Sequence, residues 1–312
     1  MLSYPADHSL RQLLDNWRRS PRPVVAALVT ATTGSSYRKP GALALIDAQG
    51  LAIGCISGGC LELDLLAAAQ QALHTGDCTV VRYDTRSDED RVFGSQTGCR
   101  GEVEVLLWPD RSGSGHALFD ALVDADDNHQ SIWVGPSRAP SPPKLDCAPS
   151  NQSAYLRIAP PPRLLLLGAG PEAPALIGML RTLGWHVDVI EHRARYLAGD
   201  RLQGADRVLA ARPASALTGL NLDRFDAVIC ATHLFDEDRA CLELLATSAI
   251  AFIGVLGPGM RRDELLRELP EALAARLHDR VEGPAGVMLG AHGPEAVALS
   301  IAARLTQRFG HV

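Results

Sequence analysis

The sequence is poor in three features that would each place it in a large class of proteins. None of its seven cysteines forms a C-x-x-C pair, and an odd number of cysteines in a 312-residue chain argues against a disulfide scaffold. No apolar run approaches the roughly 18 residues of a membrane-spanning helix. Basic residues are not in excess, since 30 Lys and Arg stand against 36 Asp and Glu, a net charge of −6. We therefore expect neither nucleic acid nor a membrane as a partner.

A secretory signal is also missing from the beginning of the sequence. Residues 1–20 do not place positive charge before an apolar stretch, and their pattern predicts an amphipathic helix. We expect a cytoplasmic protein. The length allows two domains with substantial cores.

The part from 161 to 312 alternates short apolar segments with helical patterns. Residues 163–167 (RLLLL) are almost wholly apolar, as a central parallel strand should be. Further strands are predicted at 187–190, 207–209, 227–230 and 251–255, with a last helix over 294–308. This alternation predicts an α/β fold whose C-terminal domain is a Rossmann-like, doubly wound parallel sheet.

The part from 1 to 110 predicts an N-terminal α+β domain. Its expected strands are 24–29, 42–47, 51–55, 78–83 and 103–108, with a helix starting at Cys60. Residues 111–160 are rich in Pro and Gly and predict a connecting region that holds a helix over 116–124 and a strand or two.

Two cysteines stand in glycine-rich turns. Gly58 and Gly59 precede Cys60, and a thiol at the start of a helix would have a lowered pKa. Cys99 lies between two glycines with Arg100 beside it, which also favours a thiolate. Both cysteines could instead be small residues that fill tight turns. Neither has an evident His–Asp partner, so a soft-metal or sulfur-handling role fits better than a cysteine hydrolase.

A second glycine pattern follows the strand at 163–167. In Gly168-x-Gly170-x-x-Ala173 the first glycine allows a tight turn, and the second lets a pyrophosphate approach. Glu191 ends the next predicted strand, where an acid can bond a ribose hydroxyl. Pro171 removes one N–H from the phosphate cradle. The pattern predicts a nucleotide-type fold, but a fold does not establish a bound nucleotide.

Two weaker signals complete the set. Residues 32–41 form a polar, glycine-containing loop in which Ser36, Arg38 and Lys39 suit a phosphate monoester, although the loop could simply be solvated. His233 ends a predicted parallel strand, at the edge where open sheets bind ligands. An isolated histidine is more often structural than catalytic.

The combination of these motifs resembles the XdhC/CoxI family, the accessory factors of xanthine and carbon monoxide dehydrogenases. The resemblance rests on ATTGSSYRKPG at 31–41, GCISGGCLE at 54–62, GCRGEVEVL at 98–106, PPRLL with GAG at 161–170, FIGVLG at 252–257 and GAHGPEAVALSIAA at 290–303. It covers nearly all of the chain except 111–158. The N-terminal motifs are specific, whereas the glycine loop alone would not be.

The resemblance implies a chaperone for the molybdenum cofactor, either molybdopterin or its cytosine dinucleotide, and not a turnover enzyme. Such a protein shields the cofactor, presents it for sulfuration by a cysteine desulfurase and inserts it into an apo molybdenum hydroxylase of the xanthine or aldehyde dehydrogenase type. A homodimer is also expected. The residues implied are Cys60 and Cys99 at the molybdenum, Gly58, Gly59, Ser36, Arg38 and Lys39 around the cofactor, and Gly168, Gly170 and Glu191 at a nucleotide.

Three positions depart from the family pattern, all in the C-terminal half. Pro171 stands where a histidine commonly follows Gly-Ala-Gly, Gly-Pro-Gly at 257–259 replaces Gly-Ser-Arg, and Met-Leu-Gly-Ala at 288–291 replaces Asp-Ile-Gly-Ala. We therefore predict that nucleotide binding in this half is weakened or altered.

Two other functions remain open. One is an NAD(P)-dependent oxidoreductase in which the glycine loop holds the coenzyme and His233 acts as acid or base. The other is a scaffold that brings the desulfurase and the dehydrogenase together.

Overall fold

The computed structural model describes residues 9–19, 22–50, 52–59, 61–84, 101–111 and 116–310 of the chain. The chain divides into two compact units between Pro160 and Pro161, and each is considered by itself. None of the helices in the described ranges is both long and apolar enough to span a membrane.

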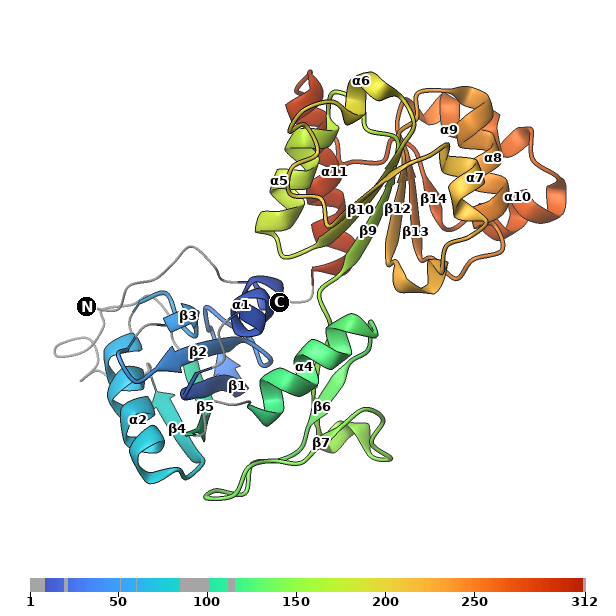
Figure 1. Cartoon of the computed structure of the whole chain (residues 1–312). Coiled ribbons are helices and arrows are strands. Elements are labelled where there is room, and N and C mark those ends of the chain that lie inside the picture. The colour runs from blue at the N-terminus through green and yellow to red at the C-terminus, as the bar shows by residue number, and fades with distance from the viewer. Residues whose placement is uncertain are drawn as a thin grey trace. The chain divides into compact units, whose positions relative to one another are not determined.

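The N-terminal unit is built on an antiparallel sheet with the strand order β3-β2-β1-β5-β4 (Figure 1). Its elements are α1 (Leu10–Arg19), β1 (Val24–Gly34), β2 (Leu43–Asp47), β3 (Ala52–Gly54), α2 (Glu62–Thr75), β4 (Thr79–Asp84), β5 (Gly101–Asp110) and α4 (Ala117–Asp127). Alternate residues of β1 point to opposite faces of the sheet. Val24 and Leu28 join the core with α1 and α4, whereas Val25 and Val29 join the core with α2. The continuous apolar run of β1 reflects burial on both faces.

The observed boundaries differ from the predicted ones by one or more residues, and two of the differences bear on the site. Strand β1 continues to Gly34, because it pairs with β5 as far as Gly101 after a register shift between Val29 and Ala31. Residues 32–34 are therefore strand, and the predicted loop starts only afterwards. Helix α2 begins at Glu62 and not at Cys60, because the Glu62 carboxylate binds the backbone of the preceding turn, as described below.

Residues 116–158 form part of the N-terminal unit. After α4 come β6 (Ile132–Val134), β7 (Leu145–Asp146), the 3₁₀ helix η1 (Gln152–Ala154) and β8 (Leu156–Ile158), with the sheet order β7-β6-β8. Leu118 and Phe119 of α4 lie in the same core as Leu13 of α1. The indole Nε1 of Trp17 donates to Asp120 Oδ1 at 2.9 Å. Most of the stretch predicted as a connecting region thus packs against the N-terminal core, since its proline-rich turns still leave room for short apolar elements.

The C-terminal unit holds a parallel sheet with the strand order β11-β10-β9-β12-β13-β14. Its strands are β9 (Arg163–Leu167), β10 (His186–Glu191), β11 (Arg207–Ala210), β12 (Ala227–Cys230), β13 (Phe252–Val255) and β14 (Val281–Glu282). Its helices are α5 (Ala173–Thr182), α6 (Ala194–Leu197), α7 (Pro213–Leu217), η2 (Leu222–Arg224), α8 (Phe235–Leu245), α9 (Gly259–Arg267), α10 (Glu271–Leu277) and α11 (Pro294–Phe309).

This unit confirms the predicted doubly wound sheet. Leu164 and Leu166 of β9 pack with α5 and α11, whereas Leu165 and Leu167 pack with α7, α8, α9 and α10 on the other face. Figure 1 shows these two helical layers on either side of the strands. The strand order reverses between β9 and β12, and the carboxyl ends of these neighbouring strands are where such sheets bind ligands.

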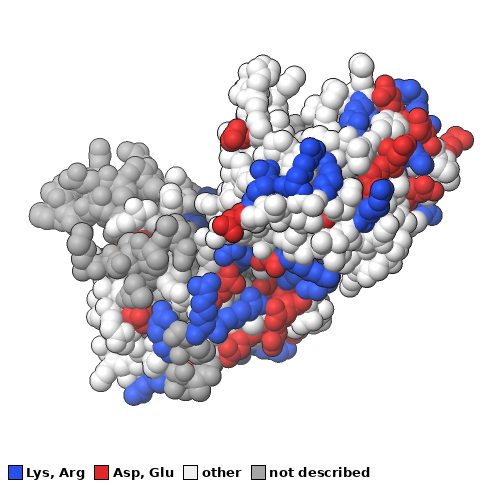
Figure 2. All heavy atoms as spheres, turned by 45° about the horizontal axis from the view of Figure 1, so that its top comes forward, with Lys and Arg blue, Asp and Glu red and all other residues white. Residues whose placement is uncertain are grey.

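Figure 2 shows the charged side chains of the described residues. On the face that is visible, Lys and Arg lie interspersed with Asp and Glu, and basic side chains do not form one continuous surface there.

Candidate functional site

The turn before α2 is held by a buried pair of side chains, Ser57 and Glu62. Ser57 Oγ donates to Glu62 Oε2 at 2.5 Å, and Ser57 N donates to Glu62 Oε1 at 3.2 Å. The same two side chains accept the N–H of Leu61, at 3.2 Å on Ser57 Oγ and 3.0 Å on Glu62 Oε2. Ser57 Oγ also accepts the N–H of Gly59 at 3.1 Å. The backbone of this turn is therefore fixed from within.

The two glycines of the turn lie exposed at its tip. Gly59 has φ +111°, and a Cβ there would meet no atom of the described residues within 4 Å. A Cβ at Gly58 would lie 3.9 Å from the ring of Tyr37. The loop after β1 and the glycine turn are thus adjacent, and the turn leaves space for a ligand.

Arg38 reaches from that loop toward the base of the turn. Burial raises the pKa of the Cys55 thiol, while the charge of Arg38 opposes the rise and that of Glu62 adds to it. The Nε of Arg38 is buried and has no hydrogen-bond partner in the described part of the chain. Lys39 Nζ lies 3.4 Å from Ser36 Oγ, to which it donates. The structure therefore brings Tyr37 and Arg38 of this loop close to the turn, while Ser36 and Lys39 lie next to each other in the same loop.

The predicted thiols Cys60 and Cys99 lie outside the described residues. What the structure places is their flanks. Gly59 and Leu61 belong to the turn, and Gly101 begins β5 opposite Gly34. A Cβ at Gly101 would lie 2.4 Å from the carbonyl oxygen of Ser35, so only glycine allows β5 to enter beside the loop.

The other cysteines divide by burial. Cys78, Cys230 and Cys241 are buried, and burial raises the pKa of each thiol, that of Cys78 to about 11. Cys147 is exposed. Within the described ranges, no three His, Cys, Asp or Glu side chains are grouped so that they could hold a metal ion.

The glycine loop of the C-terminal unit lies between β9 and α5. Gly168 has φ +94°, and its N–H donates to the carbonyl of Ile190 at 2.8 Å. A Cβ at Gly168 would lie 2.4 Å from the carbonyl oxygen of Ala231. This position requires glycine on both counts, as the sequence pattern predicted.

Glu191 ends β10 and is fully buried. Its Oε2 accepts the N–H of Ala169 at 2.8 Å and Nη2 of Arg193 at 2.6 Å. Its Oε1 accepts the N–H groups of His192 and Arg193 at 2.8 and 2.7 Å and Nε of Arg193 at 2.9 Å. Burial alone would raise the pKa of Glu191, but the bonds from Arg193 and Ala169 outweigh it and lower the pKa to about 2. The carboxylate is saturated by the chain itself, and its role toward a ribose stays a prediction.

Glu172 lies inside the glycine loop and is not among the site residues predicted from the sequence. A Cβ at Gly170 would lie 2.6 and 2.7 Å from the two carboxylate oxygens of Glu172, and 2.5 Å from Nε2 of His233. Glu172 is 4% exposed. Its Oε1 lies 3.6 Å from His233 Nε2 and has no hydrogen-bond partner within the described ranges. The sequence feature that could have identified Glu172 is an acidic residue directly after Gly-x-Gly-Pro.

Hydrogen bonds and one ion pair join the segments that follow β10 and β12 to α8 and α9. Arg193 Nη1 donates to the carbonyl of Thr232 at 2.9 Å, and Thr232 Oγ1 donates to Asp238 Oδ1 at 2.6 Å. Arg261 Nη2 donates to Asp238 Oδ2 at 2.8 Å. Arg261 therefore serves the fold at this edge.

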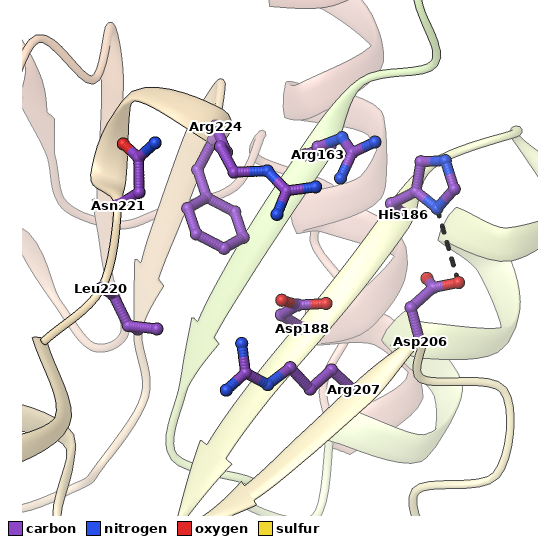
Figure 3. A pocket seen from close by; sticks show the side chains of 9 residues that line it. Arg163, His186, Asp188, Asp206, Arg207, Leu220, Asn221 and Arg224 are labelled. Carbon is purple, nitrogen blue, oxygen red and sulfur yellow. Dashed lines mark ion pairs between the residues drawn. The ribbon is translucent and has the colours of Figure 1, made fainter. Parts of the chain in front are cut away.

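A cavity of about 250 Å³ opens at the opposite, amino-terminal edge of the same sheet (Figure 3). It is lined by Arg163, His186, Asp188, Asp206, Arg207, Leu220, Asn221, Arg224 and Phe225. His186 Nδ1 lies 3.4 Å from Asp206 Oδ1. Burial and the charge of Asp206 raise the pKa of Asp188, against the charges of Arg207, Arg163 and His186. None of the site residues predicted from the sequence lines this cavity.

Comparison with known proteins agrees with both units. The pattern of the XdhC and CoxI family matches residues 17–84, and that of the XdhC Rossmann domain matches residues 164–305. A protein of Bacillus subtilis, named as a probable subunit of xanthine dehydrogenase, is 28% identical over 95% of this chain and 96% of its own length. The crystal structure of a xanthine dehydrogenase from Bacillus halodurans superposes with a TM-score of 0.81 at 28% identity, over 96% of this chain and 95% of that one.

A second relative matches over a smaller part of both chains. The uncharacterized protein YqeB from Escherichia coli is 29% identical over 148 residues, which are 47% of this chain and 27% of that protein. Together the two family matches cover most of both sheets and more than half of the chain. The chain therefore belongs to the XdhC and CoxI family.

Proposed function

We propose that this protein is an accessory factor that binds the finished molybdenum cofactor, protects it and inserts it into an apo molybdenum hydroxylase of the xanthine dehydrogenase type. Support comes from the family and from the names of its relatives, which refer to xanthine dehydrogenase. In this proposal the cofactor is cargo, and the protein itself catalyses no turnover.

The observation that carries the proposal is the orphaned guanidinium nitrogen of Arg38. A buried donor without an acceptor is costly, about 1–3 kcal/mol, so a phosphate oxygen that accepts from it would be strongly favoured. Ser36 and Lys39, which contact each other in the same loop, add a hydroxyl and a second positive charge. Gly58 and Gly59 leave their tip of the turn uncovered. The residues present fit an anionic group such as the phosphate of the pterin.

Cys60 and Cys99 are proposed to face the molybdenum. Thiolates are suitable ligands for a soft metal centre. Cys60 directly follows Gly59 of the turn, and Cys99 stands two residues before Gly101, which enters beside Ser35. The bound cofactor would bring a molybdenum centre that accepts sulfur from a cysteine desulfurase. The protein's own residues would bind the phosphate, orient the cofactor and limit access of water.

The test is to express the full chain where the cofactor is made, purify it without oxygen, and measure molybdenum and pterin per chain. We expect both in the wild type, loss of both in Arg38→Ala, and loss of molybdenum in Cys60→Ser or Cys99→Ser. Arg82→Ala and Cys147→Ser are matched controls, since Arg82 is exposed and paired with Glu104 at 2.9 Å and Cys147 is exposed. A wild type without cofactor, together with thiol variants that still support maturation of the hydroxylase, would contradict the proposal and favour a scaffold.

The partners belong to the same proposal. We propose a homodimer in the cytoplasm that contacts a cysteine desulfurase and the apo hydroxylase in turn. Sedimentation of the purified protein, alone and with each partner, tests the assembly independently of cofactor content.

A further inference from the structure

We infer that the glycine loop of the C-terminal unit is closed to the pyrophosphate of a dinucleotide by the carboxylate of Glu172, which makes Glu172 a specificity-determining residue of this unit. The inference concerns the C-terminal unit alone. It holds whether or not the N-terminal site carries the molybdenum cofactor.

The carboxylate of Glu172 lies against Gly170 in the glycine loop. In a dinucleotide-binding loop the second glycine is required because the pyrophosphate comes close to its backbone. Gly170 is that glycine here, and the space beside its Cα is filled from within. Both carboxylate oxygens of Glu172 and Nε2 of His233 lie within 2.7 Å of the point that a Cβ would occupy. The close approach that the glycine allows is thus used by the chain's own side chains.

The carboxylate of Glu172 also occupies the place where the start of a helix favours an anion. The start of a helix such as the ten-residue α5 favours an anion, and the carboxylate of Glu172 already lies there. It is 4% exposed, so water screens it poorly and its repulsion of a phosphate is strong. Pro171 cannot donate an N–H to the loop. A dinucleotide would meet a fixed negative charge where it needs donors.

Glu191, the carboxylate at the position that usually binds the ribose, is occupied as well. A ribose needs a carboxylate with a vacant lone pair at the end of the second strand. Glu191 has the right position, but it accepts five hydrogen bonds from its own chain, three of them from Arg193. Two anchors of a dinucleotide are therefore replaced by internal contacts, which also disfavours an NAD(P)-dependent oxidoreductase.

His233 covers the same space but does not close it by charge. Its backbone has φ +62°, its side chain is 46% exposed, and its Nε2 lies 3.6 Å from Glu172 Oε1. An exposed imidazole can turn aside, whereas the buried carboxylate cannot leave without exposing the loop. We therefore assign the exclusion to Glu172.

The experiment is a titration of the full-length protein with NADH, followed by nicotinamide fluorescence, and with inorganic pyrophosphate, followed by calorimetry. We expect no saturation of the wild type below about 1 mM of either probe. Glu172→Gln keeps the shape and removes the charge, and Glu172→Ala removes both. Each should tighten pyrophosphate binding on the order of 100-fold, given the strength of a poorly screened contact between like charges.

Two controls separate charge at this position from charge in general. Glu295→Gln removes an exposed carboxylate from the first turn of α11 and should change nothing. His233→Ala should leave pyrophosphate binding as weak as in the wild type. Micromolar binding of either probe by the wild type would overturn the inference without any variant. Equally weak pyrophosphate binding by the wild type and by a folded Glu172→Gln variant would also overturn it. Tighter pyrophosphate binding by His233→Ala would do the same.

Discussion

The hydroxyl of Ser57 donates to the carboxylate of Glu62 at 2.5 Å, and both side chains are buried. This contact closes the turn that carries Gly58 and Gly59, and its two acceptors also hold the N–H groups of Gly59 and Leu61. The site residues of the N-terminal unit therefore depend on a pair that itself faces inward.

We predict that Ser57→Ala destabilises the protein by about 1–3 kcal/mol, because it removes the hydroxyl that donates to the buried Glu62 carboxylate and accepts the N–H of Gly59. Chemical denaturation of the full-length protein measures this loss in the free energy of unfolding. Ser153→Ala is the control, since the Ser153 hydroxyl bonds only to nearby Asn151 and is exposed. Equal stability of the two variants would contradict the importance of this pair.

Glu191 should make the stability of the C-terminal unit sensitive to acid. Its pKa is lowered in the folded state from 4.5 to about 2, so it contributes stability above pH 4.5 that is lost as the pH falls toward 2. The contribution at neutral pH is on the order of 3 kcal/mol. Glu191→Gln should be less stable than the wild type at pH 7, and the difference should shrink between pH 4.5 and 2. A difference that is constant with pH, or as small as that of half-exposed Glu243→Gln, would refute this.

Replacing two glycines of the C-terminal unit with alanine should change its stability in opposite directions. Gly168→Ala forces a Cβ against the carbonyl of Ala231 at positive φ, and we expect a loss of at least about 3 kcal/mol. Gly178→Ala lies on the exposed side of α5, where a Cβ meets nothing within 4 Å. It should raise stability by about 0.5–1 kcal/mol, because alanine is the better helix former. Thermal melts of both variants decide this, and a stable Gly168→Ala would show that the loop can rearrange.

The cysteines should differ in reactivity. At pH 8, iodoacetamide should label exposed Cys147 and leave Cys230 and Cys241 intact, because burial raises the pKa of both buried thiols and blocks access. Cys78, with a pKa of about 11, should also resist. Mass spectrometry of the digested protein measures labelling at each site, with urea-unfolded protein as the reference in which all should react. Labelling of Cys230 in the folded state would contradict the core as described.

Much of the fold followed from local patterns. Residues 163–167 are recognisable as a central strand because both faces of β9 are buried, and the last helix, predicted over 294–308, is α11. Pairing between segments far apart in the sequence was harder to predict. β1 extends to Gly34 only because Gly101, far away in the sequence, pairs with it. A helix over 116–124 was expected, but its packing on α1 through Trp17 and Asp120 was not.

The same difference between local sequence patterns and tertiary contacts applies to the candidate site. Residue types and spacing were enough to single out the glycine turn with Ser36, Arg38 and Lys39, and the loop with Gly168, since turns and anion-binding loops have local signatures. Which partners those groups meet is decided by segments that only the tertiary fold brings together. The saturation of Glu191 by Arg193 and Ala169 and the position of Glu172 against Gly170 and His233 are of this kind. A sequence pattern specifies which donors and acceptors are present, but hydrogen bonding and exclusion depend on distances across the fold.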